Sequence, residues 1–317
     1  MSFTGGGSDL PSFYRENGGA VVSTTIDKYI YVNVNKKFDN GVRVAYSRTE
    51  EVSGAAEIQH PLVRASLEFL RISGGIEITT IADIPSRGTG LGSSSSFTVG
   101  LLHALNAFLG RHVSREQLGK DSCHIELNVC GEPIGKQDQY AAAFGGFNFI
   151  EFKGDESVVV SPVICDRTTI QNVEANILML YTGITRSASA LLKDQSRDVA
   201  GDLGKIRILR RLVELAHQLR ADLQENSLSS IGPILHESWM LKKSISPGIS
   251  SDTIDEWYAT ARRAGAQGGK ILGAGAGGFL MLYAPRESHD AIKSSLRNLR
   301  SVDIKFDPLG SRIVFYQ

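Results

Sequence analysis

Three glycine-rich segments, one near each end of the chain and one in the middle, place the strongest limits on how it can fold. They read FTGGGSDLP (3–11), GTGLGSSSSF (88–97) and LGAGAGGF (272–279). Because glycine has no Cβ, each segment can turn tightly and bring its backbone amides close to an anion. We therefore treat all three as candidate ligand-binding loops.

The middle segment runs directly into a periodic apolar stretch that predicts a helix over 94–109. A helix N-terminus presents unpaired N–H groups and a partial positive charge, and both suit a polyphosphate. The competing interpretation is a serine-capped helix after a flexible turn, although four serines exceed what one cap requires. A Walker loop is excluded, because no lysine follows the second glycine. The candidate phosphate-binding residues are Gly90, Leu91, Gly92, Ser93, Ser94, Ser95 and Ser96.

The last segment satisfies the G-x-G-x-x-G pattern of dinucleotide-binding folds between Gly273 and Gly278. The residues that follow, FLMLY, read as a strand rather than a helix. In addition, no acidic residue ends a second strand about 20 residues later. The dinucleotide interpretation is therefore rejected.

The remaining chain alternates strands and helices in two sections of unlike order. The first section predicts strands over 20–35, 42–47, 76–81 and 147–152, a hairpin turn at Asn40-Gly41, and helices over 56–70, 94–109 and 114–129. Ser114 precedes Gln117 by three residues, which is a capping-box spacing for the start of the last of these helices. The second predicts a strand over 175–181, a long helix from about 206 to 223, helices near 227–243, 251–264 and 288–299, and two strands around the last glycine loop. This pattern predicts a two-domain α+β protein, with domains at 1–168 and 169–317.

Composition excludes several classes of protein. The 317 residues carry 34 Lys plus Arg and 34 Asp plus Glu, so there is no basic field to hold nucleic acid or an anionic membrane. No stretch approaches the roughly 20 apolar residues of a membrane span, and the N-terminus does not read as a signal peptide. The uneven set of Cys123, Cys130 and Cys165 predicts reduced thiols, so we expect a cytoplasmic protein. Oligomeric state stays open, and a homo-oligomer is compatible with the sequence.

In this order and spacing, the three glycine segments resemble those of the GHMP kinase superfamily. PSRGTGLGSSSSF (85–97) is similar to the nucleotide loop of that superfamily, and GGKILGAGAGGF (268–279) is similar to its C-terminal glycine motif. The segments GEPIGKQDQYAAAFGG, YTGITRSA and HESWMLKKSISPGIS resemble the D-glycero-α-D-manno-heptose-7-phosphate kinase branch. The resemblance covers nearly the whole chain. It implies an N-terminal domain of the ribosomal-protein-S5-domain-2-like type and a ferredoxin-like α/β C-terminal domain.

The resemblance also implies roles for single residues. Ser94 and Glu126 would bind Mg²⁺, and Gly275 would join the middle loop in binding ATP. Asp138 would accept the proton of the attacking hydroxyl. Lys136 would keep Asp138 ionised or touch the γ-phosphate, although an exposed loop lysine is an equal alternative. A solvated helix face is the alternative for Glu126.

The first glycine segment would hold the sugar. The resemblance assigns Asp9 to the sugar hydroxyls, with the neighbouring residues Gly6, Gly7 and Ser8. A sugar phosphate also needs a cationic partner, for which Arg186, Lys243 and Lys242 are candidates, each with a solvated surface as the alternative. Members of this superfamily begin with a strand that carries a basic residue before this segment, whereas the chain starts at Met1, almost inside the motif.

These features predict an ATP- and Mg²⁺-dependent sugar kinase. By resemblance, it would phosphorylate O1 of D-glycero-α-D-manno-heptose 7-phosphate to the 1,7-bisphosphate, for the nucleotide-activated heptose of bacterial surface polysaccharides. Two alternatives stay open. One is a kinase for another sugar, such as fucose or a uronic acid. The other is a catalytically inactive regulator that binds a nucleotide or a sugar.

Overall fold

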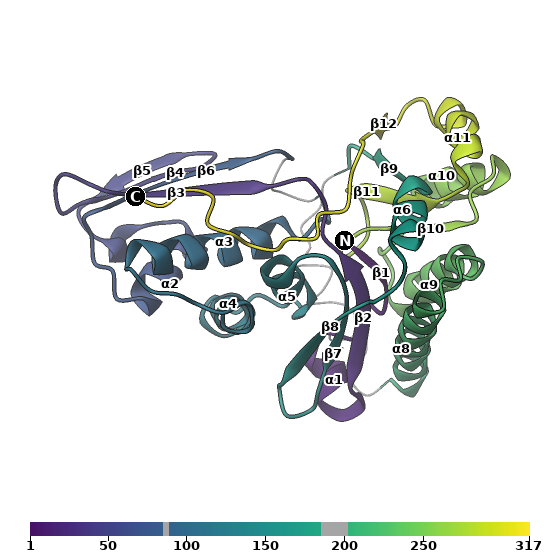
Figure 1. Cartoon of the computed structure of the whole chain (residues 1–317), viewed down its shortest axis with the longest axis horizontal. Coiled ribbons are helices and arrows are strands. Elements are labelled where there is room, and N and C mark those ends of the chain that lie inside the picture. Colours follow the sequence, from purple (N-terminus) through teal and green to yellow (C-terminus); the bar gives the residue numbers. More distant parts are fainter. Residues whose placement is uncertain (85–88, 185–201) are drawn as a thin grey trace.

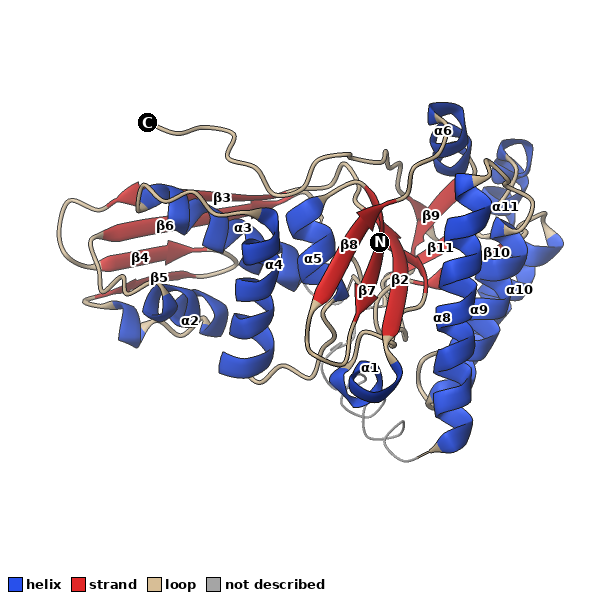
Figure 2. Ribbon diagram, turned by 60° about the horizontal axis from the view of Figure 1, so that its bottom comes forward, coloured by secondary structure: helices blue, strands red, loops and turns tan. Residues whose placement is uncertain are grey.

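The computed structural model describes residues 1–84, 89–184 and 202–317, and its two halves meet near the centre of the molecule (Figure 1). The described residues form three four-stranded sheets with helices packed against them. Figure 2 shows one sheet at each end of the molecule and the third between them. Strands and helices are mixed in both halves, so the predicted α+β class is confirmed. In the described ranges, no helix has both the length and the apolar composition needed to cross a bilayer.

The outermost sheet contains a crossover that the sequence did not predict. Its order is β3 (Ile30–Lys36), β6 (Ile76–Ala82), β4 (Val42–Ala45) and β5 (Thr49–Val52). Because β6 pairs antiparallel with β3 and parallel with β4, the expected hairpin at Asn40-Gly41 is wrong. The central position buries Ile76 and Ile78 of β6 completely, which stabilises the sheet more than a local turn can.

Helices cover one face of this sheet. The expected helix over 56–70 is shorter than predicted: a 3₁₀ turn (Ala55–Glu57) comes first, and α2 (Pro61–Phe69) begins at a proline, which suits the first helical position. The long helix α3 (Ser93–Phe108) and α4 (Arg115–Cys123) agree with prediction, and Ser114 Oγ accepts the expected capping bond from Gln117 N at 3.2 Å. A π-helical turn (His124–Val129) then extends α4, and α5 (Gln137–Phe144) follows.

The central sheet joins the two halves. Its order is β1 (Ser2–Thr4), β2 (Gly19–Thr24), β7 (Phe147–Phe152) and β8 (Val158–Pro162), with α1 (Pro11–Asn17) between β1 and β2. Every residue of β2 is buried, because α5 contacts this strand and α8 packs on it as well. Phe3 and Phe149 belong to the same apolar core as Trp239, so this core continues from one half into the other.

The C-terminal half begins with α6 (Arg167–Ala175), and the predicted domain boundary at 168/169 falls inside this helix. Its sheet has the order β10 (Gly268–Ile271), β11 (Phe279–Tyr283), β9 (Ile177–Tyr181) and β12 (Arg300–Ser301). The helices are α8 (Leu203–Gln224), α9 (Ile231–Ile245), α10 (Asp252–Arg263) and α11 (His289–Ser295). After β12 the chain returns to the N-terminal half, where Phe306 forms a β-bridge with Ile26. The last glycine segment is the loop of the β10–β11 hairpin, as predicted.

Candidate active site

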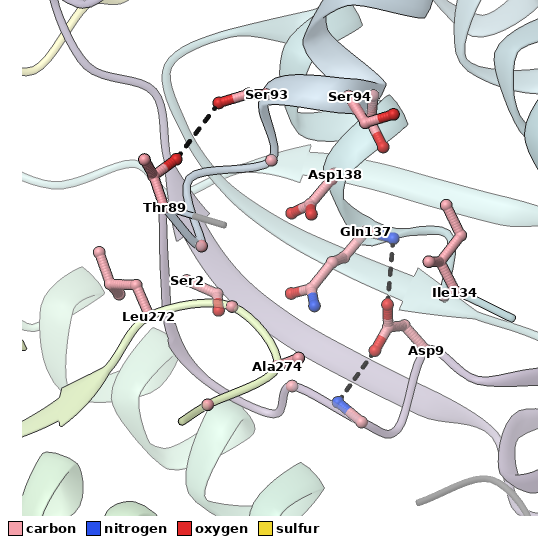
Figure 3. Close-up of a pocket in the computed structure, with 18 of the residues that line it drawn as sticks. Ser2, Asp9, Thr89, Ser93, Ser94, Ile134, Gln137, Asp138, Leu272 and Ala274 are labelled. Carbon is pink, nitrogen blue, oxygen red and sulfur yellow. Dashed lines mark hydrogen bonds between the residues drawn. The ribbon is translucent and has the colours of Figure 1, made fainter. Parts of the chain in front are cut away.

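The three glycine-rich segments, which are far apart in the sequence, meet at one cavity of about 240 Å³ (Figure 3). The cavity lies where the loops of the N-terminal half face the β10–β11 loop of the C-terminal half. Residues 132–138, which lead into α5, close another side. Its lining includes Gly6, Gly7, Asp9, Thr89, Gly90, Gly92, Ser93, Ser94, Ser95, Gln137, Asp138, Lys242, Lys270, Leu272, Gly273 and Gly275.

The middle glycine segment forms the start of α3. Gly92 adopts φ +67°, in the left-handed region that favours glycine, and its carbonyl accepts the hydrogen bond of Ser96 N at 2.9 Å. The first turn of α3 has N–H groups without a partner inside the helix, and its residues Ser93, Ser94 and Ser95 line the cavity. Ser93 lines both this cavity and a smaller hollow of about 50 Å³ behind it. Leu91 and Ser96, which we expected among the phosphate contacts, line only the smaller hollow.

The middle and last glycine segments touch backbone to backbone. A Cβ on Gly90 would lie 2.3 Å from the carbonyl oxygen of Leu272, and a Cβ on Gly278 would lie 2.2 Å from that of Thr89. Neither position has room for a side chain, and both glycines have positive φ. The glycines at this point therefore allow the two halves to close around the cavity.

Asp9 is fixed at the opposite side of the cavity. Its side chain is buried, and it accepts hydrogen bonds from Gly7 N at 2.9 Å and from Gln137 N at 3.3 Å. Gly6 and Gly7 line the cavity beside it. The expected role of Ser8 in substrate binding is wrong, because its hydroxyl donates to Ala20 O at 3.2 Å and accepts from Ala20 N at 3.1 Å. Ser8 holds the glycine turn against β2 instead.

Asp138 projects into the cavity from the first turn of α5 (Figure 3). A Cβ on Gly92 would lie 2.9 Å from its carboxyl carbon, so the two residues are in contact. Burial raises the pKa of its carboxyl group. The amino group of Met1 opposes this rise, Asp9 adds to it, and Lys270 also opposes it. A carboxylate with a raised pKa is a better proton acceptor near neutral pH than an ordinary aspartate.

Lys136 does not share this cavity, so its expected contact with the γ-phosphate is wrong. Its Nζ forms an ion pair with Glu156 and lies 4.8 Å from the centre of the Tyr14 ring. Two residues along a helical backbone correspond to about 200° of rotation, so Lys136 and Asp138 point to opposite sides. Lys136 therefore ties the start of α5 to the turn before β8.

Glu126 lies in the π-helical turn, next to the middle glycine segment (residues 88–97), which we call the serine loop. Its carboxylate is completely buried and, among the described residues, accepts hydrogen bonds from four neutral groups: Ser94 at 3.2 Å, Ser95 at 2.8 Å, Thr98 at 3.0 Å and the Gln139 amide. Desolvation raises its pKa, and these hydrogen bonds oppose the rise. The alternative of a solvated helix face is therefore wrong.

The pair of Ser94 and Glu126 fits a magnesium ion. Ligands about 2.1 Å from an octahedral ion lie about 3 Å apart when they are neighbours, and Ser94 Oγ lies 3.2 Å from Glu126 Oε1. Both are hard oxygen ligands, and Ser94 faces the cavity. The described residues contain no group of three or more His, Cys, Asp or Glu suited to a metal. A magnesium ion here would therefore complete its shell with phosphate and water oxygens.

Of the expected phosphate-binding cations, the structure favours Lys242 over Lys243. Lys243 Nζ forms an ion pair with Asp255 at 2.8 Å and is not part of the cavity lining, so its expected contact with the substrate is wrong. Successive residues on a helix are about 100° apart, and this rotation turns Lys242 into the cavity, where its Nζ donates to Gly6 O at 3.2 Å. Arg186 lies outside the described residues.

The sequence reasoning missed Lys270. It lies on β10, is 7% exposed and lines the cavity together with Leu272, two residues further along. Burial and the nearby Lys242 lower its pKa to about 7, against the attraction of Asp9 and Asp138. Burial alone lowers the pKa of Lys242 to about 8, against Asp9. The available signal was a lysine just before the last glycine loop, in GGKILGAG.

Comparisons with known proteins agree with this geometry. Residues 54–146 match the GHMP kinases N terminal domain, and residues 219–300 match the GHMP kinases C terminal domain. The chain is 30% identical over 307 residues to a D-glycero-alpha-D-manno-heptose 7-phosphate kinase of Campylobacter jejuni, covering 93% of this chain and 90% of that one. It is 27% identical to a bifunctional fucokinase/GDP-fucose pyrophosphorylase of Arabidopsis thaliana, with 96% of this chain and 31% of that protein covered.

The fold agrees as well. A crystal structure described as a D-glycero-D-manno-heptose 1-phosphate kinase from Bacteroides thetaiotaomicron superposes with a TM-score of 0.80 over 98% of this chain and 94% of that one, at 24% identity. The sequence matches fall on both sides of the cavity, and they include the serine loop and the last glycine loop. This chain therefore belongs to the GHMP kinase family of phosphotransferases.

Proposed function

We propose that the chain transfers the γ-phosphoryl group of ATP to O1 of D-glycero-α-D-manno-heptose 7-phosphate. The observation that carries this proposal is that the serine loop, Asp138 and Asp9 line one cavity although they lie on three separate segments. The cavity thus combines a candidate phosphate-binding site at the serine loop, a proton acceptor in Asp138 and a carboxylate in Asp9 that can bind sugar hydroxyls. The similarity to the heptose 7-phosphate kinase of Campylobacter jejuni supports this choice of acceptor.

The nucleotide would lie across the start of α3. The free N–H groups and hydroxyls of the first turn suit its β- and γ-phosphates. The smaller hollow on the other side of Ser93 is lined by Tyr29, Ile30, Ile84 and Leu91, and these side chains suit a planar base. Ser94 and Glu126 would hold Mg²⁺, which supplies neutralisation of the phosphate charge when it is bound.

The acceptor would lie between Asp9 and Asp138. Asp9 has two fixed oxygens that can accept hydrogen bonds from neighbouring sugar hydroxyls. Asp138 would accept the proton of O1 as this oxygen attacks phosphorus, and its raised pKa suits that role. Lys242 lies within electrostatic range of Asp9 and is placed to bind an anionic group on the acceptor.

A substrate screen tests the acceptor. Purified protein is incubated with MgATP and a panel of sugars and sugar phosphates, and the products are identified by mass spectrometry and NMR. We expect phosphorylation at O1 of the heptose 7-phosphate, with the free heptose a much poorer substrate. Equal reaction of unphosphorylated sugars would reject the heptose 7-phosphate. Turnover of fucose in particular would favour the activity named for the Arabidopsis relative.

Asp138→Asn tests the mechanism, and a loss of turnover in this variant would exclude an inactive regulator. We expect turnover to fall about 100-fold or more while ATP binding stays within about twofold, because the amide cannot accept the proton. Asp290→Asn is the matched control, since Asp290 is exposed in α11 and lies outside the cavity lining. Near-normal turnover of Asp138→Asn would remove this residue from the mechanism.

A further inference from the structure

The cavity contains a buried ammonium group that the proposed mechanism does not use. Lys270 is 7% exposed and lines the cavity, yet no hydrogen bond or ion pair joins its ammonium to another residue in the described part of the chain. Lys242, by comparison, donates to Gly6 O. A buried charge without a partner destabilises a protein, so a ligand is the expected partner of Lys270.

The position of Lys270 places it toward the phosphate end of the cavity. It lies two residues before Leu272, whose carbonyl touches Gly90 of the serine loop. Alternate residues of a strand face the same side, and both Lys270 and Leu272 line the cavity. Lys270 also lies within electrostatic range of both Asp9 and Asp138, with Asp9 the stronger influence, so its ammonium faces the space between these two carboxylates.

The reaction needs a cation at this end. A phosphoryl group in transfer carries negative charge on its three outer oxygens, and catalysis consists mainly of positioning and neutralisation. The serine loop contains no lysine, and Lys136 points away toward Glu156. We propose that the ammonium of Lys270 contacts the phosphoryl group as it passes from ATP to the acceptor, and so supplies a cation beside the start of α3.

This inference rests on the proposed function and adds a residue to it. In the step, the bond from the γ-phosphorus to the bridging oxygen of ADP breaks and a bond to the acceptor oxygen forms. The hydroxyl proton moves to Asp138. Lys270 keeps its proton throughout and acts by charge and hydrogen bonding alone.

Nucleotide binding tests the inference without any acceptor. Affinities for ADP and for the non-hydrolysable analogue β,γ-imido-ATP are measured by calorimetry with Mg²⁺, for wild type, Lys270→Met and Lys270→Arg. If Lys270 contacts the γ-phosphate, Lys270→Met weakens the analogue about tenfold or more and changes ADP affinity less than twofold. Lys270→Arg keeps the positive charge and should recover part of the lost affinity for the analogue. Lys243→Met is the matched control, because Lys243 pairs with Asp255 outside the cavity, and it should leave both affinities unchanged.

Turnover provides the second measurement. With an acceptor found in the screen, Lys270→Met should lower kcat about 100-fold and change the acceptor KM less than threefold, whereas Lys242→Met should mainly raise that KM. An unchanged ratio of analogue to ADP affinity in folded Lys270→Met would overturn the inference. If no sugar reacts with the wild type, the proposed acceptor fails, and the nucleotide affinities still decide the role of Lys270.

Discussion

Replacing Lys270 by methionine should stabilise the free protein while it removes activity. The side chain is buried and its pKa is lowered from 10.5 to about 7, so the folded state holds the ammonium far less readily than the unfolded chain. Each pKa unit corresponds to about 1.4 kcal/mol. The buried ammonium therefore costs the folded state about 4 to 5 kcal/mol at pH 6.5. Methionine has a similar length and carries no charge, so this cost disappears.

The sign of the pH dependence follows from the same values. Above pH 10.5 Lys270 is neutral in both states and there is no cost, and below pH 7 it is protonated in both and the cost is complete. Between these limits the unfolded chain binds more protons, so the wild type gains stability as the pH rises. At pH 9.5 the cost has fallen to about 1 kcal/mol. The other charged groups near Lys270 are Lys242, Asp9, Asp138 and the amino group of Met1.

Thermal unfolding without ligand measures this effect. For a chain of 317 residues the unfolding entropy is about 0.7 kcal/mol/K, so Lys270→Met should raise Tm by about 7 °C at pH 6.5 and about 2 °C at pH 9.5. The control Lys243→Met removes a partly exposed ion pair and should change Tm by less than about 2 °C at either pH. A variant that is less stable than wild type at pH 6.5, or a Tm difference that does not change with pH, would refute the reasoning.

Three further predictions concern the loops, the metal and the pH profile. Gly90→Ala should lower Tm and the affinity for the ATP analogue more than Gly110→Ala does. Both glycines have positive φ, but only a Cβ on Gly90 would lie against a carbonyl oxygen, at 2.3 Å. Equal effects of the two substitutions in thermal shift and calorimetry would contradict the packing. Glu126→Gln should raise the Mg²⁺ concentration for half-maximal activity about tenfold or more. Glu287→Gln, at an exposed position, is the control. An unchanged Mg²⁺ titration of Glu126→Gln would exclude Glu126 as a ligand. The value of kcat/KM should fall about fivefold between pH 7 and pH 8, because a pKa of about 7 lowers the protonated fraction of Lys270 from about one half to about one tenth. Lys270→Arg should remove this fall because arginine stays charged, and the same pH profile in both enzymes would assign the fall to another group.

Short-range patterns were sufficient to predict the elements that depend on them. The helix of α3 and the cap at Ser114 could be read from the sequence, because the apolar spacing and the capping residue act within one or two turns. The hairpin at Asn40-Gly41 failed for the opposite reason. Strand β6, more than 30 residues away, lies between the two strands that the turn would join. Burial of its isoleucines outweighs the local preference.

The candidate active site shows the same difference between local features, which the sequence predicts, and long-range contacts, which it does not. The sequence by itself identified the segments that are candidates for ligand binding, because glycine runs, a serine-capped helix start and a carboxylate in a turn are local features with local chemistry. Only the tertiary structure decided which side chains share the cavity: it placed Lys242 and Lys270 inside, and Lys136, Lys243 and Ser8 outside. The physical reason is that the direction of a side chain depends on a rotation of about 100° per helical residue and on packing between distant segments. The rotation follows from the helix itself, but which face of the helix turns toward the cavity is set by packing against segments that are far away in the sequence.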